Sequence, residues 1–527
     1  MAKDAYSNQD FADFLAEGVE VRNYDLDDQH NIEGMLSVKI PIERKPKWSD
    51  FAQEITGEIV DELGNKSSSA VLIIRHNGTV FAFTLGYGRY LIDATYFVQD
   101  FGIKTALNTL NHDSLRSVDL HTLDEQGVQK RLQTTRNSEV TVFGIDISKD
   151  ILRSVTGSTK DGVIFKQVSG GDSVFSFGLD MNINELPEIA DQLSTYYDND
   201  DYKGSFSWVD NIRRIKEKSL IDSLDEELVQ EIKNKSDSIV ITLPEISQWD
   251  EIYGFSFTRS KKIINPTIES EDYLVNIDAD IVSIESIKRD KLYVHDTCEK
   301  TQEHSLYKCL YFENKKVEKT CVLFLGIWYE IDNTFIGRVN QVLGQIKISE
   351  LEFPTVYTWE EDEKFKIESE GDYNERAADD FEFHLLDKKL VKSNKITTAI
   401  EVCDLMTDDK HLVHVKHRKG GSSGLSHLFA QGNVSAEILL GDKEFRRKTR
   451  TVLRGINPEI GDYIPLKSLK SSDFEVVYLI LGESSETIKD NLPFFSKVNL
   501  TKAFENLSQK GFAVSISGAA KEARPTT

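Results

Sequence analysis

The 527-residue sequence contains little cysteine, proline or glycine. Its four cysteines are widely spaced, and no two of them have CxxC spacing: Cys298, Cys309, Cys321 and Cys403. This pattern is typical of free thiols in a reducing compartment, and it argues against a disulfide framework or a cysteine-based zinc site. Ten prolines and 31 glycines, beside a hydrophobic fraction of 39%, favour packed cores over a disordered chain.

Long hydrophobic runs are also absent. The longest strongly apolar stretch lies near Val322–Tyr329, less than half of the ~20 residues that a membrane span needs. The first residues, Met1–Tyr6, lack the basic segment and apolar run of a signal peptide. No P-loop motif is present, which argues against a P-loop ATPase. We therefore expect a cytoplasmic protein without a membrane partner.

Positive charge is in deficit. The chain has 63 Lys and Arg residues against 88 Asp and Glu residues, a net charge of −25. Each phosphate that a protein neutralises requires a cation, so the overall field of this chain repels DNA and RNA. A nucleic-acid partner would have to bind a local basic patch.

The length exceeds what one hydrophobic core supports, which is roughly 250–300 residues. We expect an α+β or α/β multi-domain protein with an N-terminal α+β domain, a middle α+β domain, a C-terminal domain and a flexible tail, at residues 1–200, 201–370, 371–515 and 516–527. Within the first domain, Asn77-Gly78 between two apolar runs predicts a β-hairpin over Ser69–Gly86. The pattern of Lys149–Val155 predicts a short helix.

The C-terminal domain has the predicted order helix, three strands, helix. These segments are Tyr373–Asp380, Phe381–Leu390, Ala399–Met406, His411–His417 and Leu425–Leu440. This order predicts a mixed sheet flanked by helices.

Two neighbouring strands of this domain carry charged residues in otherwise apolar surroundings. Side chains alternate along a strand, so Asp404 lies on the face opposite to Glu401, while His414 and Lys416 share one face of the next strand. A carboxylate and a lysine on adjacent strands can stand ~5 Å apart. A charge in an apolar strand is costly unless it is paired or binds a metal. The pattern is compatible with a catalytic site and with a buried ion pair in an ordinary sheet.

The arrangement resembles the core of the PD-(D/E)xK nuclease superfamily, in which a strand Asp is followed by an acid-x-Lys strand. The resemblance implies a restriction-endonuclease-like core with Asp404 as a metal ligand and Lys416 as the catalytic lysine. His414 stands where the second acid is expected, and Cys403 stands where Pro is expected. Glu401 would join the Mg²⁺ or Mn²⁺ site if a bulge turned it, and Glu375 would be the acid of the first helix.

Basic residues near these strands are candidates for phosphate binding. Arg418 and Lys419 follow the third strand, and Arg447, Arg450 and Arg454 have i, i+3, i+7 spacing on a predicted helix. This face would suit a nucleic-acid backbone, although a solvated helix paired with acidic neighbours explains the spacing equally well. His411, His414 and His417 alternate between faces, which argues against a zinc site.

Over most of its length the chain also resembles a sporadically distributed bacterial family of unassigned function. The likeness lies in Phe81–Arg89, Leu115–Ser117, Gly144–Asp146, Ile151–Gly157, Trp328–Glu330, Ile400–Leu405, His414–Lys416, Ser422-Ser423 and Leu425–Gly432. Patchy occurrence of this kind resembles that of anti-phage defence genes. The leading hypothesis is a metal-dependent phosphodiesterase, a nuclease of DNA or RNA, in phage defence. The alternative is a non-catalytic sensor or adaptor that binds a partner protein such as a phage protein, a class that the net charge favours.

Overall fold

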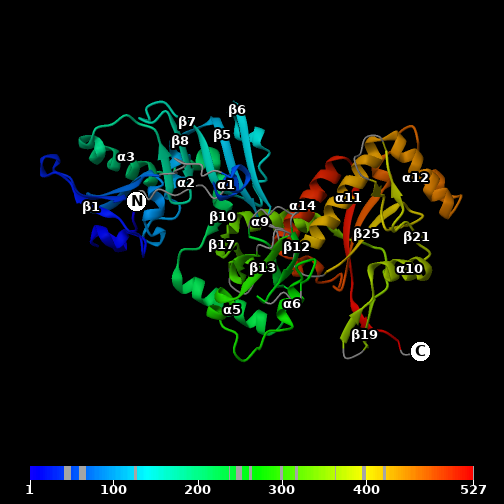
Figure 1. Cartoon of the computed structure of the whole chain (residues 1–527). Helices are drawn as coiled ribbons and strands as arrows, with labels where there is room; N and C mark the ends of the chain where they lie inside the picture. The colour runs from blue at the N-terminus through cyan, green and yellow to red at the C-terminus, as the bar shows by residue number, and fades with distance from the viewer. Residues whose placement is uncertain are drawn as a thin grey trace. The chain divides into compact units, whose positions relative to one another are not determined.

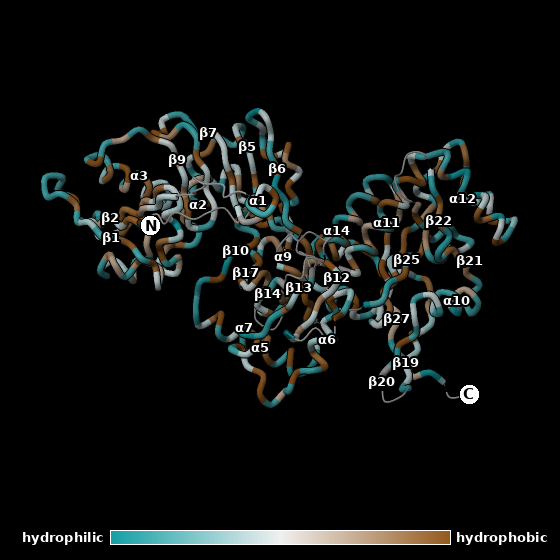
Figure 2. Tube along the Cα trace, in the orientation of Figure 1, coloured by the Kyte–Doolittle hydropathy of each residue, from teal (hydrophilic) through white to brown (hydrophobic). Residues whose placement is uncertain are grey.

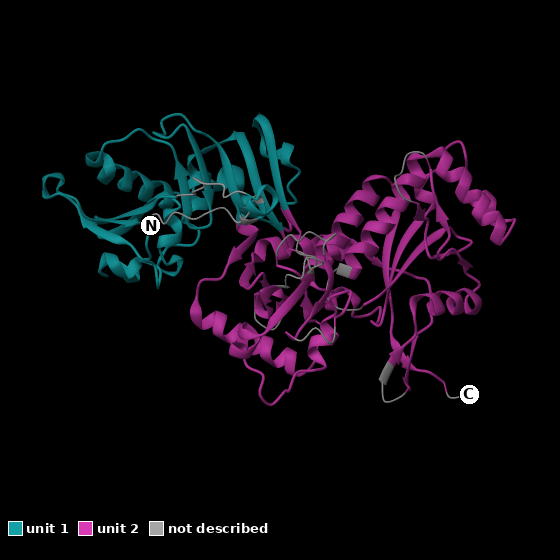
Figure 3. Ribbon diagram, in the orientation of Figure 1, with its two compact units in different colours: residues 1–121, 130–146, 150–209 teal, residues 122–129, 147–149, 210–527 magenta. Residues whose placement is uncertain are grey.

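A computed structural model gives the structure of the chain. It describes residues 1–40, 49–57, 67–123, 128–236, 238–244, 252–259, 264–296, 301–314, 319–361, 364–393, 399–418 and 423–525. The chain forms two compact units (Figures 1 and 3), the first made of residues 1–121, 130–146 and 150–209, the second of residues 122–129, 147–149 and 210–527. The boundary at 209 lies close to the predicted end of the first domain at 200, and the second unit contains both further predicted domains. The protein is mixed α+β, as predicted.

Unit 1 is built on two sheets. One has the order β1-β2-β3-β4, with strands at Arg22–Asp25, Glu33–Lys39, Ser69–His76 and Thr79–Gly86. The other has the order β6-β5-β7-β8-β9, with strands at Gln129–Ser138, Leu110–Thr122, Asp150–Thr159, Gln167–Gly171 and Val174–Phe177. The predicted hairpin is confirmed: β3 pairs with β4, and Asn77 and Gly78 have φ of 49° and 77°.

Helix α2 (Phe101–Thr109) packs on the second sheet of unit 1, and helix α3 (Leu186–Asp198) packs beside it. The contact is close, because a Cβ on Gly102 would lie 2.1 Å from the carbonyl oxygen of Val174. The helix predicted over Lys149–Val155 is wrong, since most of this segment is the start of β7. Leu152 and Val155 are buried in the core below α2, and pairing of β7 with β8 decides the conformation.

The middle part of unit 2 contains two antiparallel sheets. The five-stranded order is β10-β17-β16-β15-β11, at Ile212–Arg214, Ile327–Ile331, Cys321–Phe324, Leu310–Asn314 and Val240–Ile241; the three-stranded order is β12-β13-β14, at Ile252–Ser256, Lys291–Asp296 and Thr301–Ser305. Its helices include α5, α6, α7, α8 and α9, at Lys218–Lys233, Ser270–Leu274, Ile284–Arg289, Leu306–Cys309 and Asn333–Gln345. Asp225 of α5 is buried in this core and accepts hydrogen bonds from Tyr307, Trp328 and Lys288.

The C-terminal part of unit 2 is a six-stranded mixed sheet between helices (Figure 1). Its order is β18-β27-β26-β25-β24-β21, at Lys347–Ile348, Ala513–Ala519, Glu475–Leu481, His411–His417, Leu405–Met406 and His384–Leu385. The first four are parallel to one another, β24 pairs antiparallel with β25, and the edge strand β21 pairs antiparallel with β24. The helices are α10, α11, α12, α13 and α14, at Glu370–Asp380, Ser423–Gly441, Lys443–Ile456, Ile488–Asn491 and Phe494–Gln509.

The alternation of β25 and β26 separates two cores. Leu412 and Tyr478 pack with Leu428 of α11 and Leu500 of α14 on one face. On the other face, Val413, Val415 and Leu479 pack with α10 through Tyr373 and Ala377. The sheet is therefore covered on both faces, which explains why β26 is almost wholly apolar.

Two small sheets complete this part: β20-β19-β28, at Lys364–Ile367, Val356–Glu361 and Lys521–Ala523, and β22-β23, at Leu390–Val391 and Ile400–Glu401. Where the sequence predicted a flexible tail from residue 516, the structure continues β27 to Ala519 and adds β28. Figure 2 shows apolar residues spread over both units. Among the described helices, none is both long enough and apolar enough to cross a bilayer.

Candidate functional site

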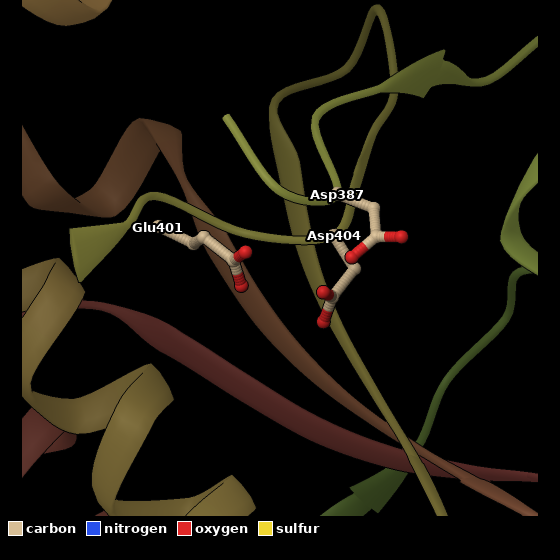
Figure 4. Close-up of side chains that lie close together, drawn as sticks. All are labelled: Asp387, Glu401 and Asp404. Carbon is tan, nitrogen blue, oxygen red and sulfur yellow. The ribbon is translucent and has the colours of Figure 1, made fainter. Parts of the chain in front are cut away.

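Three carboxylates meet at the edge of the six-stranded sheet (Figure 4). One oxygen each of Asp387, Glu401 and Asp404 lie within 4.8 Å of one another. Asp387 follows β21, Glu401 ends β23, and Asp404 directly precedes β24. The backbone brings them together, because the amides of Leu386 and Asp387 both donate to the carbonyl oxygen of Asp404, at 2.8 and 2.9 Å.

Glu401 reaches this cluster because the predicted strand 399–406 is interrupted. Regular pairing stops after Glu401 and resumes at Leu405, so strict alternation no longer turns Glu401 away from Asp404. In Figure 4 its side chain points toward Asp404. Its Oε1 accepts from the backbone amide of Lys388 at 2.9 Å, and its Oε2 accepts from Nε2 of Gln431 on α11 at 3.0 Å. The carboxylate is thus held in place from two sides.

Asp404 is the most buried member of the cluster, with 7% of its surface exposed. Its Oδ2 accepts a hydrogen bond from the backbone amide of Val415 at 2.8 Å. Burial raises the pKa of Asp404 to about 7, the negative charges of Glu401, Asp387 and Glu370 add to this, and the bond from Val415 opposes it. The cluster therefore carries uncompensated negative charge at a buried carboxyl group.

Lys416 lies on β25 and is bound by an acid that the sequence did not single out. Its Nζ donates to Oε2 of Glu370, the first residue of α10, at 2.8 Å, and Oε1 of Glu370 accepts from the backbone amide of His417 at 3.0 Å. Burial raises the pKa of Glu370, but the bonds from Lys416 and His417 outweigh it and leave the pKa below its usual value. Lys416 and Asp404 are thus neighbours of the same acid and are not paired directly.

Two further predicted site residues do not join the cluster. Glu375 is exposed on α10, and no hydrogen bond or ion pair in the described part of the chain links it to the three carboxylates. His414 is fully buried on the α11 side, where its Nε2 lies 3.4 Å from Oγ of Ser435. Burial lowers the pKa of His414 to about 3, so the ring is neutral. It cannot reach a ligand at the cluster without leaving the core.

The predicted basic residues have different surroundings. Arg418 pairs with Glu483 and donates to the carbonyl oxygen of Asn491, and Lys419 lies outside the described residues. On α12, Arg450 and Arg454 both pair with Asp462, whereas Arg447 is exposed. Apart from Arg447, the described basic residues that were predicted to bind phosphate therefore already form ion pairs with acids.

The acids Asp387 and Glu370 and the amide Gln431 were missed by the sequence analysis. A signal for Glu370 was present: Ser369 is a helix N-cap whose side chain accepts from the amide of Asp372, which places Glu370 at the helix start. Asp387 lies in a polar turn and Gln431 inside a helix, and nothing in their local sequence points to Glu401 or Asp404.

The comparisons with known proteins identify the chain at the level of a family. No curated protein and no solved structure matches it. The model of a family described as a family of unknown function (DUF6119) matches residues 2–519, consistent with the resemblance to a family without an assigned function. The chain belongs to this DUF6119 family.

Proposed function

We propose that this protein is a metal-dependent phosphodiesterase that cleaves nucleic acid. The observation that carries the proposal is the convergence of Asp387, Glu401 and Asp404 within 4.8 Å, beside the strand that presents Lys416. Clustered carboxylates together with a lysine are suited to hydrolysis of phosphate esters, because the carboxylates can hold a divalent cation that activates water and the lysine can neutralise charge at phosphorus.

The donor set fits Mg²⁺ or Mn²⁺, which bind carboxylate oxygens. Asp387, Glu401 and Asp404 would hold the ion. Three carboxylates repel one another at this separation, and the pKa of Asp404 is raised mainly by burial and further by that repulsion. The one lysine ammonium recorded beside them among the described residues is Lys388, whose Nζ is 3.5 Å from Asp387 and whose side chain is 79% exposed. A bound divalent cation would supply the missing positive charge, activate water and neutralise phosphate oxygens.

Lys416 would stabilise the negative charge that develops on the phosphate. Its side chain is 34% exposed, so it can contact a ligand, and the bond to Glu370 fixes where the ammonium lies. The positions of Glu401 and Lys416 are both set by hydrogen bonds to helices that flank the sheet, Gln431 of α11 and Glu370 of α10. Catalytic side chains need neighbouring residues that hold them in a fixed orientation, and Gln431 and Glu370 would do this for Glu401 and Lys416.

The order of elements supports the same function. Strands lie between helices α10 and α11, but the predicted strands 381–390 and 399–406 are each divided into two two-residue strands, β21 with β22 and β23 with β24. We propose that α10, β21, β24, β25 and α11 form a restriction-endonuclease-like core. The predicted role in defence would make phage nucleic acid the substrate.

The test is cleavage by the purified chain with Mg²⁺ or Mn²⁺, offered duplex and single-stranded DNA and RNA. Lys416→Ala should abolish cleavage while circular dichroism stays unchanged. Glu375→Gln is the matched control, since Glu375 is exposed on the same helix as Glu370, and it should cleave like the wild type. Equal cleavage by wild type and Lys416→Ala would contradict the proposal.

A second candidate is a non-catalytic binding protein, and the low exposure of Asp404 favours it. A carboxyl group with 7% of its surface exposed can serve as a buried polar element of a sheet edge. In that case no substrate would be cleaved, and neither metal would bind at the cluster.

A further inference from the structure

We propose that a turn beside the carboxylate cluster, together with helix α12, binds the phosphodiester backbone of the nucleic acid. Three lysines lie between β21 and Ser393, Lys388 and Lys389 before β22 and Lys392 directly after it, and all three are exposed. We call them the lysine turn. With the exposed Lys443 and Arg447 of α12 they form what we call the basic track. That the ligand is a nucleic acid rests on the proposed function, cleavage of nucleic acid.

The lysine turn is joined to the carboxylate cluster by the backbone. Asp387, a member of the cluster, directly precedes Lys388, and the amide of Lys388 donates to Glu401 at 2.9 Å. Lys388 has a φ of 61°, a left-handed conformation that is unfavourable for a lysine. This conformation belongs to the turn in which the amide of Lys389 donates to Leu386. The same turn therefore orients a carboxylate of the cluster and carries the first lysines of the track.

Helix α12 is fixed to the other end of this segment. Nζ of Lys448 donates to the carbonyl oxygen of Lys392 at 2.7 Å, and Oγ of Ser393 donates to Asp442, which caps the start of α12. Strand β22 and helix α12 lie side by side in the C-terminal part of unit 2 (Figure 2). Lys443 and Arg447 are four residues apart and so lie on one side of the helix. The cations of the track thus sit on two elements held together beside the cluster.

The charge of the basic track is opposite to that of the whole chain. Residues 387–392 contain three lysines and one acid, in a protein with 88 acids and 63 cations. Lys448 pairs with Glu444, and Arg450 and Arg454 pair with Asp462, so these three are not part of the basic track. Lys388 also lies 3.5 Å from Asp387, but it remains in the track because its side chain is 79% exposed. For Lys389, Lys392, Lys443 and Arg447 no side-chain ion pair is recorded within the described part of the chain. Concentrated, exposed cations next to a candidate metal site fit a polyanion better than a solvated face.

The experiment measures binding in EDTA, where no metal-dependent cleavage can occur. Fluorescence anisotropy with labelled duplex DNA, duplex RNA and single-stranded DNA gives Kd as a function of salt. The test variant is Lys388→Asn/Lys389→Gln/Lys392→Gln, in which Asn keeps the left-handed backbone of residue 388. The matched control is Lys216→Gln/Lys218→Gln/Lys235→Asn, because these lysines are also exposed and Lys235 also has a positive φ, 51°.

Both triple variants remove three positive charges, so they change the net charge equally, from −25 to −28. Each lost phosphate contact lowers the slope of log Kd against log salt by roughly 0.7–0.9. For the lysine-turn variant we expect the slope of log Kd against log salt to be smaller by about 2. At low salt, this variant should bind at least about tenfold more weakly than the wild type. The control should bind like the wild type. Lys443→Gln/Arg447→Gln, which leaves the turn intact, should weaken binding in the same direction.

Equal binding by the lysine-turn variant and the control would overturn the inference. The inference would also be overturned if the wild-type protein bound none of the three nucleic acids. In that case an acidic protein would be the partner that fits the basic track. Failure of the proposed function looks different: cleavage would be absent or independent of Lys416, while binding in EDTA would still depend on the lysine turn.

Discussion

Asp404→Asn should stabilise the metal-free protein, and it should do so more at pH 8 than at pH 5. Asp404 has its ordinary pKa of 3.8 in the unfolded chain and a pKa raised to about 7 in the folded chain. A carboxyl group with a raised folded pKa destabilises the fold in its ionised form. The resulting loss in the free energy of unfolding is small near pH 4, grows as the pH rises and reaches its full size above pH 7. Asparagine removes the charge and keeps an oxygen that can accept from Val415.

The magnitude follows from about 1.36 kcal/mol per pKa unit. The cost of the Asp404 charge is roughly 4 kcal/mol at pH 8 and roughly 1.5 kcal/mol at pH 5. The change in the free energy of unfolding on Asp404→Asn should therefore be about 2–3 kcal/mol more favourable at pH 8 than at pH 5. Any packing cost of the asparagine amide is the same at pH 5 and at pH 8, so it cancels when the two free-energy changes are compared.

The assay is urea unfolding in EDTA at both pH values, followed by circular dichroism, with Glu375→Gln as a control that should show no such difference. Adding Mg²⁺ should stabilise the wild type by mass action and leave Asp404→Asn unaffected. An effect of Asp404→Asn that is the same at pH 5 and pH 8 would refute the picture of a buried, uncompensated carboxylate.

Three further substitutions test other parts of the account. Gln431→Ala should weaken Mn²⁺ binding by about 10–100-fold in a calorimetric titration, because it removes a hydrogen bond that orients Glu401; unchanged affinity would show that the bond is not needed. Gly88→Ala should lower the free energy of unfolding by about 2–3 kcal/mol, since the new Cβ would lie 2.0 Å from the carbonyl oxygen of Ala70, and an unchanged melting temperature would contradict this. Asp225→Ala should cost about 2–4 kcal/mol because it leaves a buried tyrosine hydroxyl and a buried tryptophan N–H without their acceptor, and a loss below 1 kcal/mol by urea unfolding would speak against that network.

Elements whose conformation depends on nearby residues could be predicted from the sequence. Asn77-Gly78 predicts its hairpin because both residues accept positive φ. The helix predicted at Leu425–Leu440 is confirmed as α11, and the predicted strand His411–His417 is β25 residue for residue. The segment Lys149–Val155 shows the limit, since pairing of β7 with its neighbouring strands β5 and β8 outweighs a short helical pattern.

The candidate site could be predicted in part. Asp404 and Lys416 stood out because each is a charge in an apolar strand. Asp387 and Glu370 did not, because each is brought to the site by backbone hydrogen bonds between segments that are apart in the sequence. Alternation placed Glu401 on the wrong face, since it assumes an unbroken strand, and only the register of the flanking pairs reveals the break.

The most direct test of the central claim is a calorimetric titration of the metal-free protein with Mn²⁺ and Mg²⁺, comparing the wild type with Asp404→Ala. The account predicts saturable binding to the wild type and its loss in the variant, with the fold of both confirmed by circular dichroism. Absence of binding to the wild type, or equal binding to both proteins, would contradict it.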